Sequence, residues 1–242
     1  MNNNTDLIEY LLRLGDSALI QGQRLCQWCG KAPALEEELA LMNVGLDLVG
    51  QARNWLEYAA ELLNDGRDAD HLAFRRDERA YRNLLLVEQP NGDYAVTILK
   101  QFLYDAWHLQ VLSGLSQSSD ERIAGIASKA VKEVTYHLRR SGEWVERLGD
   151  GTEESHRRML AAIPEVWRFT VELTSADDSE QRLCDAGVTP DAAQVAAAWQ
   201  AKVSEIFASA TLPVPAAPSY FYLNARSGLH TEHLGILLAE MQ

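Results

Sequence analysis

The chain lacks the features that mark several classes of protein. It has no run of about 18 consecutive apolar residues, so we expect no membrane-spanning helix. Its first residues, MNNNTDLIEY, have no basic region followed by an apolar core, so we expect no secretory signal. Basic residues are scarce: 22 Lys and Arg against 35 Asp and Glu give a net charge of −13, which argues against direct nucleic-acid binding.

Cysteine and the common catalytic motifs are also scarce. There are 3 cysteines, and an odd number without a secretory signal fits a reducing cytoplasm. Cys26 and Cys29 have CxxC spacing, but neither two further zinc ligands nor flanking strands accompany them. A glycine-rich phosphate loop, a GxSxG motif and a Rossmann fingerprint are absent as well. These absences leave few standard enzyme classes open.

Helical periodicity is present along nearly the whole chain, and no strand-rich region or internal repeat interrupts it. The sequence therefore predicts an all-α protein with a single domain over residues 1–242. We predict no helix in the polar stretch SADDSEQ, and we expect PVPAAP to form an extended linker. The expected helices run approximately over Asp6–Trp28, Leu35–Leu63, Asp93–Leu115, Asp120–Leu148, Thr152–Leu173, Thr189–Leu212 and from Leu229 onward.

Some helix boundaries have specific signals. Asn64 begins an Asn-Asp-Gly break after the second helix. Pro164 lies inside the fifth helix and should bend it. Thr189 followed by Pro190 resembles an N-cap and a first helical position, so the sixth helix is expected to begin there.

Ionisable residues on apolar helix faces are the main candidates for chemistry. Glu133 and His137 lie one turn apart on such a face, and the largely apolar third helix carries Asp105 and His108. Further carboxylates come from the first two helices, at Asp16 and Asp47. Four helices carrying carboxylates and histidines resemble the di-iron pattern of ferritin-like bundles.

The spacing departs from that di-iron pattern. Gly50 stands three residues after Asp47, where a histidine ligand is needed. Tyr136 stands three residues after Glu133, and the histidine comes one position later. Because each residue turns the helix by about 100°, that shift points the imidazole elsewhere. A buried polar network, neutralised by Arg53, Lys129 or Lys132, is the favoured interpretation; a complete di-iron site stays open.

Two other groups of residues are weaker candidates. His230 and His233 are three residues apart and could bind a metal only with further ligands, so capping or an interface role is favoured. An arginine cluster could hold an anionic ligand. The cluster consists of Arg75, Arg76, Arg79 and Arg82.

Long stretches of the chain resemble a known family, the C subunits of bacterial ring 1,2-phenylacetyl-CoA epoxidases. The resemblance extends from near the N-terminus to the last residue. Its marks are LRLGDSALIQGQRLCQWCG, LALMNVGLDLVGQARNWLEYAAEL, RDERAYRNLLLVEQPNGDYA, QFLYDAWH, KEVTYHLRRSGEWVERLGDGT and HTEHLGILLAEMQ. Matches of this length in this order are far more specific than any short motif.

The resemblance implies a ferritin-like helical bundle with additional C-terminal helices. In that family the A subunit holds the di-iron centre and binds phenylacetyl-CoA, while the C subunit has lost the metal site and supports A structurally. A reductase subunit supplies electrons from NADPH through FAD and an iron–sulfur cluster, and the complex epoxidises the aromatic ring with O2. This chain is then expected to have no catalytic, cofactor-binding or metal-binding residue, and to act in the cytoplasm in phenylacetate degradation.

The resemblance also implies a relic polar network at the lost di-iron position. Its expected members are Asp47, Asp105, His108, Glu133 and His137, with Arg53 or Lys129 as charge partners. The expected partner is the A subunit, and a homodimer of the chain alone is left open. Trp28, Trp55 and Tyr58 are considered as interface anchors, although core packing is favoured for each. The alternative is that the chain is itself a di-iron carboxylate oxygenase.

Overall fold

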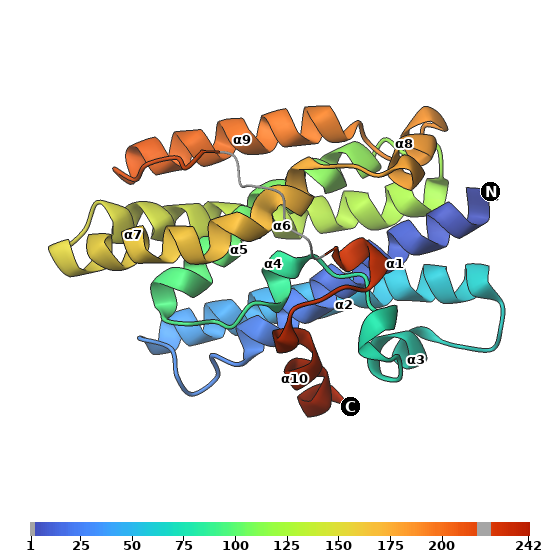
Figure 1. Cartoon of the computed structure of the whole chain (residues 1–242), viewed down its shortest axis with the longest axis horizontal. Coiled ribbons are helices and arrows are strands. Elements are labelled where there is room, and N and C mark those ends of the chain that lie inside the picture. Colours follow the sequence, from blue (N-terminus) through green and yellow to red (C-terminus); the bar gives the residue numbers. More distant parts are fainter. Residues whose placement is uncertain (1–2, 217–223) are drawn as a thin grey trace. The chain divides into compact units, whose positions relative to one another are not determined.

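The structure is a computed structural model that describes residues 3–216 and 224–242, and within these ranges the regular elements are helical (Figure 1). The all-α prediction is therefore confirmed for the described residues. The α-helices are α1 (Asn3–Cys26), α2 (Leu35–Leu63), α3 (Ala69–Phe74), α4 (Leu85–Glu88), α5 (Tyr94–Leu115), α6 (Glu121–Gly149), α7 (Glu153–Trp167), α8 (Asp178–Asp185), α9 (Ala192–Ser209) and α10 (Glu232–Met241). The 3-10 helices are η1 (Glu78–Ala80), η2 (Arg168–Thr174) and η3 (Ala225–Ser227).

Local sequence signals set the ends of the long helices. Helix α2 has the predicted bounds and stops at Asn64, whose φ of 49° is the left-handed conformation that asparagine tolerates. The side chain of Asp93 accepts a hydrogen bond from the Val96 N–H and caps α5. Asp120 caps α6 in the same way. These boundaries agree with the sequence predictions to within a residue or two.

Several boundaries differ from the predictions by three residues or more. The fifth helix is α-helical only to Trp167 and continues as the 3-10 helix η2. The N-cap of α9 is Asp191, whose carboxylate accepts from the Ala193 N–H at 2.7 Å, and not Thr189, whose hydroxyl donates to the Glu180 carbonyl. The last helix begins at Glu232, because Leu229 instead forms a short bridge with Asn224.

The two polar or proline-rich stretches behave differently. Much of SADDSEQ belongs to α8, where Asp177 and Glu180 form a capping box that compensates for the polar composition. In PVPAAP, residues 213–216 have no regular secondary structure. Its last two residues lie outside the described part of the chain.

The chain folds into two compact units, residues 1–90 with 222–242 (unit 1) and residues 91–221 (unit 2). The prediction of one domain over residues 1–242 stays a prediction. In unit 1, α1 and α2 lie side by side along their length, α3 packs on α2, and α10 packs on α4 and η1 (Figure 1). A Cβ added at Gly45 would lie 3.2 Å from the Gly22 carbonyl oxygen, so the α1–α2 contact needs glycine at this crossing.

Unit 2 is organised around α5, which packs against α6, α7 and α9. As its apolar composition predicts, α5 is buried on most sides. The indole N–H of Trp199 on α9 donates to the Leu103 carbonyl at 3.0 Å, and its ring stacks on Trp167. Polar residues of α5 are consequently enclosed with the apolar core.

Candidate functional site

The largest group of predicted site residues lies between α5 and α6 in unit 2. Asp105 and His108 project from α5, and His137 and Ser141 from α6; all four are fully buried. The Ser141 hydroxyl donates to Asp105 Oδ2 at 2.8 Å. The structure thus brings together Asp105, His108 and His137.

Burial controls the charge of this group. It raises the pKa of Asp105 to about 6, although His137 and the Ser141 hydroxyl act in the opposite direction. Burial lowers the pKa of His108 to about 3, and the nearby His137 lowers it further. The His108 imidazole is therefore neutral at physiological pH, and Asp105 changes its charge just below it.

Several polar atoms on this face of α5 lack hydrogen-bond partners among the described residues. They include Asp105 Oδ1, the hydroxyl of Tyr104 and both ring nitrogens of His108. The His108 ring lies against Tyr104, with their ring centroids 4.9 Å apart. Each such buried atom costs about 1–3 kcal/mol, so this face of α5 is less stable than an apolar face would be.

The other predicted members of the network lie elsewhere. Glu133 is half-buried on α6, and Asp47 is half-buried on α2 in unit 1. Arg53 is exposed and pairs with Glu57 at 2.7 Å, and Lys129 is exposed. Neither expected charge partner therefore lies among the buried acids; for Asp105 the structure offers Arg140, whose positive charge lowers the pKa of that carboxyl.

The donor set does not fit a di-iron centre. Such a centre needs about four carboxylates and two imidazoles that converge. The buried group in unit 2 contributes one carboxylate, Asp105, and its two histidines. Within residues 3–216 and 224–242, no group of three or more His, Cys, Asp or Glu side chains is arranged to hold a metal ion.

Asp16, the remaining candidate ligand, is neutralised within unit 1. Arg76 donates to both of its carboxylate oxygens, to Oδ2 at 3.1 Å, and the Arg82 N–H donates to Oδ2 at 2.8 Å. Burial raises the pKa of Asp16, whereas the Arg76 guanidinium lowers it. Arg82 also pairs with Glu9 at 2.8 Å. Two of the four clustered arginines thus serve internal carboxylates, which weakens the proposed anion site.

A second buried network in unit 1 was not predicted. Glu88, fully buried on α4, accepts from Asn83 Nδ2 at 2.8 Å and from the Thr231 N–H and hydroxyl at 2.6 and 2.7 Å. His230 Nδ1 lies 2.8 Å from Glu88 Oε2, and its Nε2 lies 3.0 Å from the Tyr81 carbonyl oxygen. Both ring nitrogens thus lie within hydrogen-bond distance of oxygen atoms of unit 1.

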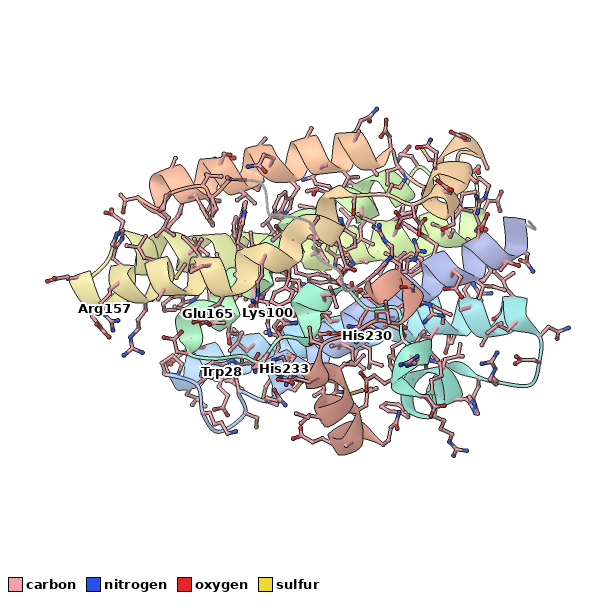
Figure 2. The ribbon with its side chains drawn as sticks, viewed as in Figure 1. Trp28, Lys100, Arg157, Glu165, His230 and His233 are labelled. Carbon is pink, nitrogen blue, oxygen red and sulfur yellow. The ribbon has the colours of Figure 1, made fainter. Side chains whose placement is uncertain are left out.

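The two C-terminal histidines, His230 and His233, have different hydrogen-bond partners (Figure 2). His230 is held by Glu88, and the Arg24 guanidinium donates to the backbone carbonyls of Glu88 and His233. The His230 side chain therefore belongs to a buried hydrogen-bonded network with Glu88, whereas His233 accepts a hydrogen bond through its backbone carbonyl. The capping or interface role of the two histidines stays a prediction. Glu88 and His230 are separated by 142 positions, so no spacing rule could have found their contact.

The fold and these sites define the class of protein. The whole chain, residues 1–242, matches the family described as "Phenylacetic acid catabolic protein", and the chain belongs to this family, whose fold is a ferritin-like helical bundle. It is 53% identical over 236 residues to the C subunit of 1,2-phenylacetyl-CoA epoxidase from Escherichia coli (strain K12), covering 98% of this chain and 94% of the relative. The resemblance read from the sequence is thereby confirmed. No helix in the described part of the chain is long and apolar enough to cross a membrane.

The raised pKa of Asp105 leads to a prediction about stability. Its folded value of about 6 lies above the unfolded value of about 3.9, so the folded protein favours the protonated acid. The stability contributed by that proton is complete below about pH 4 and is lost as the pH rises through about 6. We therefore expect Asp105→Asn to match the wild type near pH 4 and to exceed its unfolding free energy by roughly 3 kcal/mol at pH 8.

Urea unfolding at pH 4, 6 and 8 measures this difference. Ser141→Ala should have the opposite effect on stability. It removes a hydrogen bond that favours the charged Asp105 carboxylate, so its loss of stability relative to the wild type should be largest at pH 8. Identical pH profiles for the wild type and Asp105→Asn would show that Asp105 does not titrate in this range.

Proposed function

We propose that this chain is a non-catalytic structural subunit of a phenylacetyl-CoA epoxidase. In this role it binds the di-iron A subunit in the cytoplasm and holds the helices of that subunit in place. It carries no cofactor itself; iron belongs to the A subunit, and FAD, an iron–sulfur cluster and NADPH belong to the reductase. The support comes from the 53% identity to the relative from Escherichia coli, which extends over nearly the whole chain.

The chemistry of the buried residues supports the same proposal. The single observation that carries it is what binds the buried candidate ligands: Arg76 donates to both carboxylate oxygens of Asp16, and the Ser141 hydroxyl donates to Oδ2 of Asp105. A guanidinium that donates to both carboxylate oxygens takes the place that a metal would need. In unit 2, one carboxylate and two buried histidines leave a di-iron centre without most of its ligands. In this proposal, Asp105, His108 and His137 form the relic network.

Metal content tests the proposal against the alternative of a self-sufficient di-iron oxygenase. The chain is expressed in iron-supplemented medium, and iron per chain is measured by mass spectrometry, with the cognate A subunit prepared in parallel as the iron-containing control. We expect near zero iron in this chain. About two irons per chain, together with oxygen-dependent turnover in the absence of a partner, would establish the alternative.

Assembly provides the second measurement. The chain and the cognate A subunit should remain associated at nanomolar concentration, because permanent partners bury larger and more apolar interfaces than transient ones. His137→Ala in this chain should leave turnover of the assembled complex close to the wild-type value. Rapid separation of the two proteins at that concentration would rule out the proposed role.

A further inference from the structure

The two cysteines with CxxC spacing lie in one hydrogen-bonded turn at the end of α1, the turn that contains Trp28 (Figure 2). Cys26 is the last residue of the helix, and the Cys29 N–H donates to the Cys26 carbonyl at 3.1 Å. Such a turn brings the Cα atoms of its first and fourth residues within about 7 Å of each other. Because disulfides join Cα atoms that are about 4.4–6.8 Å apart, the backbone of this turn suits a disulfide.

The two thiols differ in their exposure to solvent. Cys29 is exposed, whereas Cys26 is half-buried, and neither is bonded to another cysteine. A free cysteine is usually among the most buried residues of a protein, so packing among the described residues does not explain a cysteine at position 29. An exposed thiol next to a less accessible one is the arrangement in which the first is oxidised and the second then attacks it.

The Cys26 sulfur contacts α2 and is also close to Cys29. It lies 2.8 Å from the position that a Cβ would occupy at Gly45, so the thiol covers this glycine. Burial raises the pKa of the Cys26 thiol, and the neighbouring Cys29 raises it further. Cysteine χ1 has three staggered positions, so the sulfur can exchange its contact with Gly45 for one with Cys29. Oxidation of the pair then removes a contact between α1 and α2.

We propose that Cys26 and Cys29 are a redox modification site, at which hydrogen peroxide forms a reversible disulfide. In the first step the Cys29 thiolate attacks one peroxide oxygen, which gives a sulfenic acid at Cys29 and releases hydroxide. In the second step the Cys26 thiolate attacks the sulfenic sulfur, forms the S–S bond and displaces a second hydroxide. The two hydroxides take up the two thiol protons, so two thiols and one peroxide give one disulfide and two waters. The pair loses two electrons, and the peroxide gains them.

This inference does not depend on the proposed function, because the site needs no partner subunit. A dithiol such as dithiothreitol reverses the reaction by thiol–disulfide exchange. The turn itself holds the two cysteines together in either state, since its hydrogen bond joins backbone atoms. The site is therefore expected to cycle between two thiols and one disulfide without unfolding of the chain.

Peroxide treatment of the reduced full-length chain tests the proposal. Trypsin cuts after Arg24 and Lys31, so both cysteines fall in one peptide, residues 25–31. We expect mass spectrometry to show this peptide lighter by two hydrogen atoms and resistant to alkylation. Dithiothreitol should restore two thiols that can be alkylated. Cys184 on α8 is the internal control: burial and the charges of Asp191 and Asp185 raise its pKa, so it should be oxidised more slowly than the pair.

Two serine variants identify the role of each thiol. In Cys26→Ser the exposed Cys29 has no neighbour to attack it, so it should gain oxygen atoms as the sulfenic and then the sulfinic acid. In Cys29→Ser the half-buried Cys26 remains, and its oxidation should be slower on the order of tenfold. Cys29→Ser changes an exposed side chain, so the Tm of the reduced chain should stay within about 2 °C of the wild type.

Hydrogen exchange tests the link between the disulfide and the helix contact. Oxidised wild type should lose amide protection at the end of α1 and around Gly45, because the Cys26 sulfur no longer covers that glycine. Cys29→Ser treated with peroxide in the same way should keep its protection there. Unchanged protection in the oxidised wild type would contradict the coupling to α2.

Other results would overturn the modification site itself. In one, peptide 25–31 keeps two thiols that can be alkylated after peroxide treatment. In another, wild-type Cys29 is oxidised to the sulfinic acid while Cys26 stays reduced. Disulfides between two chains, seen as a dimer on a non-reducing gel, would also show that the pair does not react within one turn. Oxidation of Cys184 at the same rate as the pair would show that the site is not selective.

Discussion

Replacing Glu88 by alanine is expected to lower the free energy of unfolding by roughly 3–5 kcal/mol, because it leaves several buried hydrogen-bond donors without an acceptor. The carboxylate and the His230 imidazole are both fully buried. The same carboxylate also accepts from Asn83 and from the Thr231 backbone and hydroxyl. Glu88→Ala therefore removes the acceptor of several buried hydrogen bonds at once.

Loss of Glu88 should also release the C-terminal segment. Thr231 and His230 are bound to Glu88 immediately before α10, and α10 packs on α4 and η1. Hydrogen exchange should therefore show reduced protection in α10 of the Glu88→Ala variant. Chemical denaturation gives the unfolding free energy. Glu240→Ala, which removes an exposed carboxylate from the same helix, is the control and should cost no more than about 0.5 kcal/mol.

A double-mutant cycle with His230→Ala tests whether the contact between Glu88 and His230 causes the loss of stability. If Glu88 acts through the His230 imidazole, the coupling energy of the two substitutions should reach about 1–3 kcal/mol. A Glu88→Ala variant that is as stable as Glu240→Ala, with α10 still protected, would mean that the network around Glu88 contributes little.

Arg76→Ala should have an effect of similar size, roughly 3–5 kcal/mol, because it leaves the fully buried Asp16 carboxylate without its cation. Arg76 also donates to the carbonyl of Ala80 at 2.9 Å, so it joins α1 to η1. Its neighbour Arg75 is exposed and provides a matched control: Arg75→Ala should change stability by less than about 0.5 kcal/mol.

The cost of Arg76→Ala should depend on pH in a definite direction. Arg76 lowers the pKa of Asp16, so its removal raises that pKa further above the unfolded value. Stability is then lost as the pH rises through the raised folded pKa, and the penalty should be larger at pH 8 than near pH 4. Urea denaturation at both pH values measures it, and a penalty that grows toward low pH would contradict the assignment.

Replacing both members of the pair tests whether charge itself is needed. Asp16→Leu combined with Arg76→Met removes two buried charges together and should cost much less than Arg76→Ala alone. This comparison also bears on function, because Asp16 is one of the carboxylates that we considered as a metal ligand by analogy with ferritin-like bundles. A tolerated apolar pair would indicate that the arginine compensates for a carboxylate with no remaining role in metal binding.

Local sequence signals were sufficient for much of the architecture. The bounds of α2 followed from its apolar stripe, its acidic first turn and Asn64, all of which act within a few residues. The burial of Asp105 and His108 followed from the apolar composition of α5. The boundary of α9 was less predictable, because Thr189 and Asp191 both suit an N-cap and only the packing against α8 engages Thr189 elsewhere.

The partners of the buried charges could not be predicted in this way. Arg53 and Lys129 were expected beside the acids, yet Arg53 is exposed and pairs with Glu57. The side chains that contact the buried carboxylates Asp16 and Glu88 are instead Arg76 and His230. A charged side chain on a helix has several acceptors within reach, and its choice depends on segments that are far away in sequence. Asp16 and Arg76 are separated by 60 positions, and Glu88 and His230 by 142.

By itself, then, the sequence determined that this protein is helical, where most of its long helices begin and end, which helix is central, and to which family it belongs. Periodicity, caps and long ordered matches carry that information because each depends on residues near one another along the chain. Only the tertiary structure decided which buried acid meets which cation, and that leucines of α2 are left exposed. Those outcomes depend on packing between segments that are distant in the sequence. A hydrogen bond forms only when donor and acceptor lie within about 3 Å of each other, and helical periodicity does not determine the distance between atoms of different helices.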